Sequence, residues 1–204
     1  MLYVIVRYVI MVLFKVLFRL QVFGLGSIPL KGGFILASNH VSYLDPPALA
    51  AACPRALSFL AKEELFTNNL FGHFFRNVNV FPIPLKTQFK TQPGVLKALR
   101  WAIRRLNAGK ALVIFPEGRR TSDGELEEPM RGIGLLTTKT AVPIIPAFIE
   151  GSSRALPVHA KFIRLKKIKV YFGRAIWPQK LGTPLNKREF YRVIAEGTME
   201  EIRR

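Results

Sequence analysis

The sequence predicts an α/β fold, a mostly parallel central sheet flanked by helices, with an amphipathic membrane helix at the N-terminus. Two observations predict the sheet: short apolar runs recur along the chain, and segments with helical spacing of apolar residues separate them. Strands that alternate with helices pair in parallel, because each helix carries the chain back across the sheet. The 204 residues, half of them hydrophobic, suffice for one such domain with an appendage.

Residues 1–23 form an apolar segment whose only charges are Arg7, Lys15 and Arg19. As a helix it would be about 33 Å long, close to the hydrocarbon thickness of a membrane. Three placements fit: a helix in the plane of the interface, a tilted span, and a very apolar core helix. The cations share one side of the helix with Gln21, and Lys15 would cost roughly 2.5–3.5 kcal/mol in a span. The sequence therefore favours the in-plane helix.

Residues 24–204 are expected to form the α/β domain. The expected strands cover residues 34–37, 57–60, 80–83, 111–115, 144–149 and 168–172. One expected helix begins at residue 45, and a second follows the strand at 57–60 and ends at about residue 76. Two more cover residues 95–106 and 132–140, and the last begins at about residue 187. Asp45, followed by Pro46, is expected as an N-cap, and Gly109 is expected to end the helix before it.

Composition limits the classes of function. The net charge of +18 indicates an anionic partner. The single cysteine, Cys53, excludes an intrachain disulfide and favours a reducing compartment. With one Cys and three His, the chain cannot assemble a Cys/His zinc cluster, and we expect no metal and no cofactor. Neither a Gly-x-Ser-x-Gly elbow nor a phosphate-binding Gly-x-x-x-x-Gly-Lys loop is present.

One group of reactive side chains follows the strand expected at 34–37. His40 at this point could act as a general base, and Asp45 could orient its imidazole and stabilise the imidazolium. Five residues correspond to about 140° on a regular helix, so a turn must bring the two side chains together. Asp45 can also be read as an ordinary helix cap, and the two interpretations are compatible. Asn39 is expected to order the turn.

A second group follows the strand expected at 111–115. The loop contains Glu117, Gly118, Arg119 and Arg120, with further glycines and hydroxyls after them. Arginines form bidentate bonds with phosphate, and glycines let backbone amides approach it. The loop therefore fits a phosphate, although a solvated basic turn is the plainer alternative.

Together these groups resemble the glycerolipid acyltransferase family. His40 and Asp45 match its His-x4-Asp motif, and Phe-Pro-Glu-Gly at 115–118 with Arg120 matches its Phe-Pro-Glu-Gly-Thr-Arg-Ser motif. Arg131-Gly132 is similar to a Lys-Gly of the family, and Val-Pro-Ile-Ile-Pro at 142–146 is similar to its fourth block. The resemblance covers residues 24 to 175, in the same order and spacing. In size the chain is closest to the bacterial 1-acylglycerol-3-phosphate acyltransferase group.

The chain departs from the family at several positions. Arg119 stands where the family usually has Thr, and Thr121 where it often has Ser. Lys86 takes the basic place of the second block, with a one-residue shift, and Lys62 is another basic position that the family tends to keep. These departures concern the acceptor headgroup more than the reaction.

The resemblance implies transfer of a fatty acyl group from acyl-CoA or acyl-acyl carrier protein to the sn-2 hydroxyl of 1-acylglycerol-3-phosphate, giving phosphatidic acid. His40 would be the base and Asp45 its partner. The implied substrate-binding residues are Arg120 for the acceptor phosphate, Lys86, Lys62 and Arg119 as further cations, and Glu117 and Gly118 at the glycerol site. Rival acceptors are glycerol-3-phosphate, another lysophospholipid or a lyso-aminolipid. A non-catalytic basic binder of membranes or nucleic acid is a rival of another class.

The expected partners are anionic membrane lipids, the lysophospholipid acceptor and the acyl donor, with no nucleic acid. Residues 154–192 contain 11 Lys or Arg and one acid, Glu189. Such a surface could hold lipid headgroups at about 1 kcal/mol per cation, dock an acidic carrier protein or CoA phosphates, or simply be solvated. We expect a monotopic or peripheral protein on the cytoplasmic face of the cell membrane.

Overall fold

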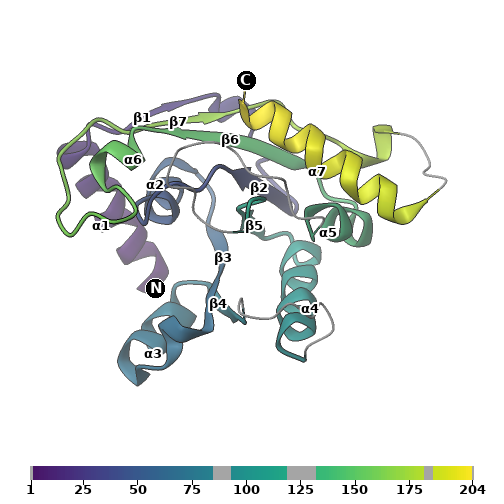
Figure 1. Ribbon diagram of the computed structural model, residues 1–204, viewed down its shortest axis with the longest axis horizontal. Helices are drawn as coiled ribbons and strands as arrows, with labels where there is room; N and C mark the ends of the chain where they lie inside the picture. The colour runs from purple at the N-terminus through teal and green to yellow at the C-terminus, as the bar shows by residue number, and fades with distance from the viewer. Residues whose placement is uncertain (1, 85–92, 119–131, 182–185, 204) are drawn as a thin grey trace.

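The computed structural model describes residues 2–84, 93–118, 132–181 and 186–203 (Figure 1). These residues form a sheet with the strand order β1-β7-β6-β2-β5-β3-β4. The strands are β1 (Gln21–Phe23), β2 (Phe34–Ser38), β3 (Leu57–Lys62), β4 (Val80–Ile83), β5 (Ala111–Ile114), β6 (Ile144–Glu150) and β7 (Lys169–Phe172). Neighbours pair in parallel except β6 and β7, which are antiparallel. The predicted α/β fold with a mostly parallel sheet is confirmed.

Helices cover both faces of this sheet (Figure 1). They are α1 (Leu2–Leu17), α2 (Asp45–Ala52), α3 (Asn69–Asn77), α4 (Pro93–Asn107), α5 (Gly132–Thr140), α6 (Ser152–Ala155) and α7 (Lys187–Arg203). Short 3-10 turns cover Leu25–Ser27, Glu63–Phe66 and Pro178–Leu181. Alternate residues of β2 enter two separate cores: Phe34 packs with α1 and α2, and Ile35 packs with α5 and α7. This strand is therefore buried on both faces, as its unbroken apolar run predicts.

The N-terminal segment differs in length from the helix expected over residues 1–23. Helix α1 ends at Leu17, and Arg19 adopts a left-handed backbone with φ 47°. The chain then continues as β1, which pairs with β7 at the sheet edge. A strand of three residues directly after an apolar helix carries no periodicity of its own, so the sequence pattern could not reveal it. The division into a membrane helix at 1–23 and a domain at 24–204 stays a prediction.

Helix α1 is docked on the sheet by polar contacts as well as by its apolar side chains. The Tyr3 hydroxyl accepts a hydrogen bond from the Leu57 backbone N–H at 2.8 Å. Arg7 donates to the carbonyls of Ala50 (3.2 Å) and Cys53 (2.6 Å) at the end of α2. An in-plane helix with its cations at the headgroups would leave Arg7 facing lipid; in this structure Arg7 bonds to α2 instead, because the last carbonyls of a helix lack partners and attract a guanidinium.

Within the described ranges, no helix is both long enough and apolar enough to cross a membrane.

The crossing of α5 and α7 depends on a glycine. A Cβ at Gly134 would lie 2.5 Å from the Tyr191 Cα, whereas a Cβ at Gly132 in the same helix would meet nothing within 4 Å. We expect Gly134→Ala to lower the free energy of unfolding by about 1–3 kcal/mol, because the helices must move apart. Gly132→Ala, the control, should leave it unchanged or slightly raised. Equal denaturant midpoints for the two variants would show that the helices do not cross this closely.

Candidate active site

The sheet brings the two groups of polar residues together at the carboxyl ends of β2 and β5. Strands β2 and β5 are parallel neighbours with Ala37 opposite Ile114, and β6 lies on the other side of β2 with Ala147 opposite Ser38. The loops that follow β2 and β5 therefore leave the sheet side by side. These are the loops that contain His40 and Glu117, so the two motifs, 77 residues apart in sequence, meet in space.

His40 and Asp45 form a hydrogen-bonded pair. Their Nδ1 and Oδ2 atoms lie 3.0 Å apart, and the turn between β2 and α2 supplies the curvature that a regular helix could not. Oδ2 also accepts the backbone N–H groups of Val41 (2.8 Å) and Ser42 (2.7 Å). Asp45 is thus the first residue of α2, with its carboxylate pointing back into the turn. The prediction that Asp45 is the N-cap is wrong, since Leu44 occupies that position.

This geometry assigns the proton on the imidazole. Because Oδ2 accepts two backbone N–H groups, it is an acceptor for Nδ1 as well, and Nδ1 carries the hydrogen. The lone pair of the neutral ring then lies on Nε2. The Asp45 side chain is fully buried, whereas the His40 side chain is 18% exposed. The pair therefore presents a proton acceptor to a ligand while its carboxylate is shielded from water.

The Phe-Pro-Glu-Gly loop, which follows β5, supports His40. Glu117, only 4% exposed, accepts the His40 backbone N–H at 3.0 Å. The Phe115 ring stacks on the imidazole with centroids 4.0 Å apart and 19° between the planes. Gly118, with φ 71°, closes a turn by donating its N–H to the Phe115 carbonyl at 3.0 Å. In this structure Glu117 holds the backbone of His40, a contact that its expected place at a glycerol site did not suggest.

Asn39 and Ser42 attach the same turn to its other neighbours. The Asn39 amide donates to the Ile149 carbonyl at 3.0 Å and accepts the Ile149 N–H at 2.8 Å, which extends the pairing of β2 with β6 by a side chain. The Ser42 hydroxyl donates to the Leu156 carbonyl at 2.8 Å. The expectation that Asn39 orders the turn agrees with these contacts. Sequence reasoning assigned no role to Phe115 or Ser42, although both lie inside the quoted motifs.

Of the four predicted cationic residues, the structure describes only Lys62. Lys62 ends β3, next to β5, with an exposed side chain. A hollow of about 340 Å³ beyond it is lined in part by Glu63, Pro82 and Pro84. Lys86, Arg119 and Arg120 lie outside the described residues. Among the described ones, no three His, Cys, Asp or Glu side chains gather as a metal site would require.

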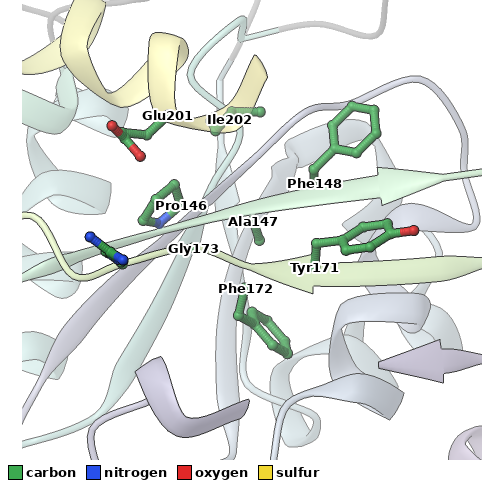
Figure 2. A pocket seen from close by; sticks show the side chains of 9 residues that line it. Pro146, Ala147, Phe148, Tyr171, Phe172, Gly173, Glu201 and Ile202 are labelled. Carbon is green, nitrogen blue, oxygen red and sulfur yellow. The ribbon is translucent and has the colours of Figure 1, made fainter. Parts of the chain in front are cut away.

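Another hollow lies away from this site. It has a volume of about 390 Å³ and is formed over β6 and β7 beside the end of α7 (Figure 2). Figure 2 shows Phe148 and Tyr171 standing on neighbouring strands, with Glu201 on the helix. Of the predicted site residues that the structure describes, none lines it, so this hollow is not part of the site built around His40.

Comparison with known proteins agrees with this site. The family model Acyltransferase matches residues 19–150, which include both motifs, and the chain therefore belongs to the Acyltransferase family. It is an enzyme of the acyl-transferring class, as the resemblance predicted.

Particular relatives narrow the comparison. The chain is 27% identical over 158 residues to the 1-acyl-sn-glycerol-3-phosphate acyltransferase of Bacillus subtilis, a match that covers 76% of this chain and 73% of the relative. It is 30% identical over 146 residues to the enzyme of that name from Streptococcus pneumoniae, covering 70% of this chain and 50% of the relative. The crystal structure of the 1-acyl-sn-glycerophosphate acyltransferase PlsC from Thermotoga maritima superposes with a TM-score of 0.73 at 25% identity, covering 97% of this chain and 80% of that one.

The turn predicts how the pair responds to loss of its charge. In Asp45→Asn the two backbone N–H groups still require an acceptor, so the amide oxygen should occupy the Oδ2 position and keep Nδ1 protonated. The negative charge that stabilises an imidazolium is lost, and the rate of acyl transfer should fall by about 100-fold. Side-chain nitrogen NMR at a pH where the ring is neutral identifies the protonated nitrogen. Protonation of Nε2 in the parent protein would contradict the arrangement.

Proposed function

We propose that this protein transfers a fatty acyl group from the thioester of acyl-CoA or acyl-acyl carrier protein to the sn-2 hydroxyl of 1-acylglycerol-3-phosphate, giving phosphatidic acid. The observation that carries the proposal is the His40–Asp45 pair, with Nδ1 and Oδ2 3.0 Å apart, at the end of a buried strand. The names of the relatives support the same acceptor. The chain spans half the length of the pneumococcal relative, so the acceptor is inferred for this chain as a proposal.

The reaction needs one base and no covalent intermediate. Nε2 of His40 takes the proton of the acceptor hydroxyl while the oxygen attacks the thioester carbonyl carbon. Asp45 stabilises the imidazolium that forms, and Phe115 covers one face of the ring, where its π-electrons favour the cation. The carbon–sulfur bond then breaks, and the leaving thiolate takes the proton from His40. The products are the ester and a free thiol, and the base returns to its starting state.

The acceptor is held by its anionic headgroup. Arg120 is proposed to bind the phosphate, since a guanidinium forms two parallel bonds with it. Arg119, Lys86 and Lys62 are proposed as further cations, and Gly118 as the position where the backbone comes close to the glycerol. Glu117 acts from behind, because its carboxylate is bonded to the backbone of the base.

We place the enzyme at the cytoplasmic face of the cell membrane, where its lipid substrate resides. Helix α1 supports this proposal, because apolar side chains cover the face that it turns away from the protein. They are Leu2, Val4, Ile5, Tyr8, Val9, Val12, Leu13, Val16 and Leu17. A helix lying in the interface buries such a face among lipid chains, and anionic lipids would be attracted by the cationic surface. Helix α1 is thus proposed as an amphipathic, in-plane membrane helix.

The proposed acceptor has three rivals. Arg119, where the family usually has Thr, adds a cation beside the proposed phosphate ligand and favours a headgroup with more negative charge or a different anionic group. Glycerol-3-phosphate, another lysophospholipid and a lyso-aminolipid are the alternatives. Offering a panel of these acceptors with a radiolabelled donor, and identifying the product, separates them.

Removal of the base tests the reaction itself. His40→Ala should lower acyl transfer by about 100-fold or more, because a positioned general base contributes at least that much. His73→Ala, at an exposed histidine of α3, is the matched control and should retain the parental rate. Transfer of labelled acyl groups measures both. A parental rate in His40→Ala would refute the mechanism.

The headgroup assignment has a separate kinetic signature. Arg120→Ala should raise the KM for the acceptor by about 10-fold or more, because charge-assisted bonds to a phosphate contribute roughly 1.5–3 kcal/mol. The KM for the thioester donor should change less. Initial rates with each substrate varied in turn provide the two constants. An effect confined to the donor would assign Arg120 to the thioester side.

A further inference from the structure

The segment between α6 and β7 exposes an unusual set of side chains. Residues 161–167 read Lys-Phe-Ile-Arg-Leu-Lys-Lys, and all seven are exposed. Phe162 is 81% exposed, Ile163 55% and Leu165 66%. A single exposed apolar side chain is ordinary, but three among four cations within seven residues, with no acid, match the composition of surfaces that bind at a lipid interface.

Hydrogen bonds hold the backbone of the 161–167 segment in place, so the fold itself keeps these side chains exposed. The Arg164 N–H donates to the Ala155 carbonyl at 2.7 Å, and the Lys166 N–H donates to the Arg164 carbonyl at 2.8 Å. At its far end, the segment passes so close to Gly151 that a Cβ there would lie 2.2 Å from the Lys167 carbonyl oxygen. The polar backbone faces inward, and the apolar and cationic side chains face outward.

The 161–167 segment also lies between the active site and α1. The connection from α6 to β7, which contains this segment, begins at Leu156. The Leu156 carbonyl accepts the hydrogen bond of Ser42 in the turn that carries His40. Ile168, where the connection enters β7, donates its N–H to the carbonyl of Phe18, just after α1. Figure 1 shows the connection between α6 and β7 passing beside α1. The connection that contains the segment is therefore bonded to the chain just after α1 at one end and to the turn that carries His40 at the other.

We propose that the 161–167 segment is a second membrane contact, which docks on an anionic bilayer surface together with α1. Phe162, Ile163 and Leu165 enter the headgroup region, while Lys161, Arg164, Lys166 and Lys167 pair with lipid phosphates. Contacts at two places prevent the protein from rotating about the axis of α1. The bilayer contact stands on the segment's own surface; only its purpose, which is to hold the catalytic turn at the level of a lipid acceptor, rests on the proposed function.

Two observations favour a bilayer over an acidic carrier protein as the occupant. Both the segment and α1 expose apolar side chains, and the connection is bonded to the chain just after α1, so one lipid surface can cover both. The four cations carry complementary charge for anionic headgroups, each of which adds attraction near the surface. A carrier protein would need the cations but would leave the adjoining apolar face of α1 uncovered.

Vesicle binding by the full-length protein tests this contact. The probes are vesicles of phosphatidylcholine alone and of phosphatidylcholine with phosphatidylglycerol, and sedimentation measures the partition coefficient. Changing Lys161, Arg164, Lys166 and Lys167 to Gln should lower binding to the anionic vesicles by about 10-fold or more. Changing Phe162, Ile163 and Leu165 to Ser should lower it comparably. The matched control changes four exposed cations of the other side, Arg100, Arg104, Lys110 and Lys139, to Gln and should bind nearly as the parent does.

A fluorescent reporter distinguishes insertion from simple attraction. Cys53 is fully buried, and burial raises the pKa of its thiol, so a cysteine introduced by Phe162→Cys can be labelled selectively. Its environment-sensitive dye should shift to the blue with anionic vesicles, whereas a dye attached after Lys139→Cys should not. Equal losses of binding in the segment and control variants, or no dye shift at position 162, would overturn the proposal. So would cation-dependent binding of acyl carrier protein with unchanged vesicle binding.

Activity in neutral detergent micelles separates this inference from the proposed function. Both segment variants should transfer acyl groups there at the parental rate, because no bilayer has to be found. A loss in micelles would show that the segment serves the reaction or the fold instead. Failure of His40→Ala to reduce transfer would refute the proposed reaction while leaving the vesicle result intact.

Discussion

The Asp45 carboxylate is the contact on which the active site depends. One of its oxygens accepts two backbone N–H groups and lies 3.0 Å from the imidazole Nδ1, so a single atom holds both the turn and the His40 ring. A buried carboxylate needs hydrogen-bond donors, and here Oδ2 receives them from the backbone of the motif, whereas Oδ1 has no partner among the described residues. Val41 and Ser42, two of the four residues between His40 and Asp45, therefore have a structural role, because they supply the amides that bind the carboxylate.

The sheet supplies what one turn cannot. Parallel strands end at the same edge, so the loop after β5 reaches the turn after β2 and meets it with a carboxylate and an aromatic ring. The Asn39 side chain links the turn to β6, because it bonds to both the carbonyl and the N–H of Ile149, as a paired strand residue would. His40 is thus fixed by contacts from the ends of β2, β5 and β6. This explains why two short motifs far apart in the sequence form one candidate site.

Much of the fold could be predicted because its signals are local. The strand at residues 80–83 and the helix at residues 132–140 have the predicted bounds, since each is an apolar run or a periodic segment with clear ends. Strand β1 could not be predicted, because its pairing with β7 depends on residues almost 150 positions away. In the site, the place of His40 and Asp45 after a strand made them candidates, and the resemblance to the acyltransferase family implied their roles. The roles of Phe115 and Ser42 depend on what folds against them, and no pattern along the chain reports that.

The bonds from Arg7 have a consequence for how this enzyme can be divided. The guanidinium satisfies the final carbonyls of α2, the helix whose first residue is Asp45. The same N-terminal stretch is bonded to two strands of the sheet, because Tyr3 accepts the Leu57 N–H of β3 and β1 pairs with β7. Removing these residues would thus take away the bonds at the end of the helix that begins with Asp45. The proposed membrane helix and the turn that carries His40 are joined through α2, and we expect a truncated form to be weakened at that turn as well.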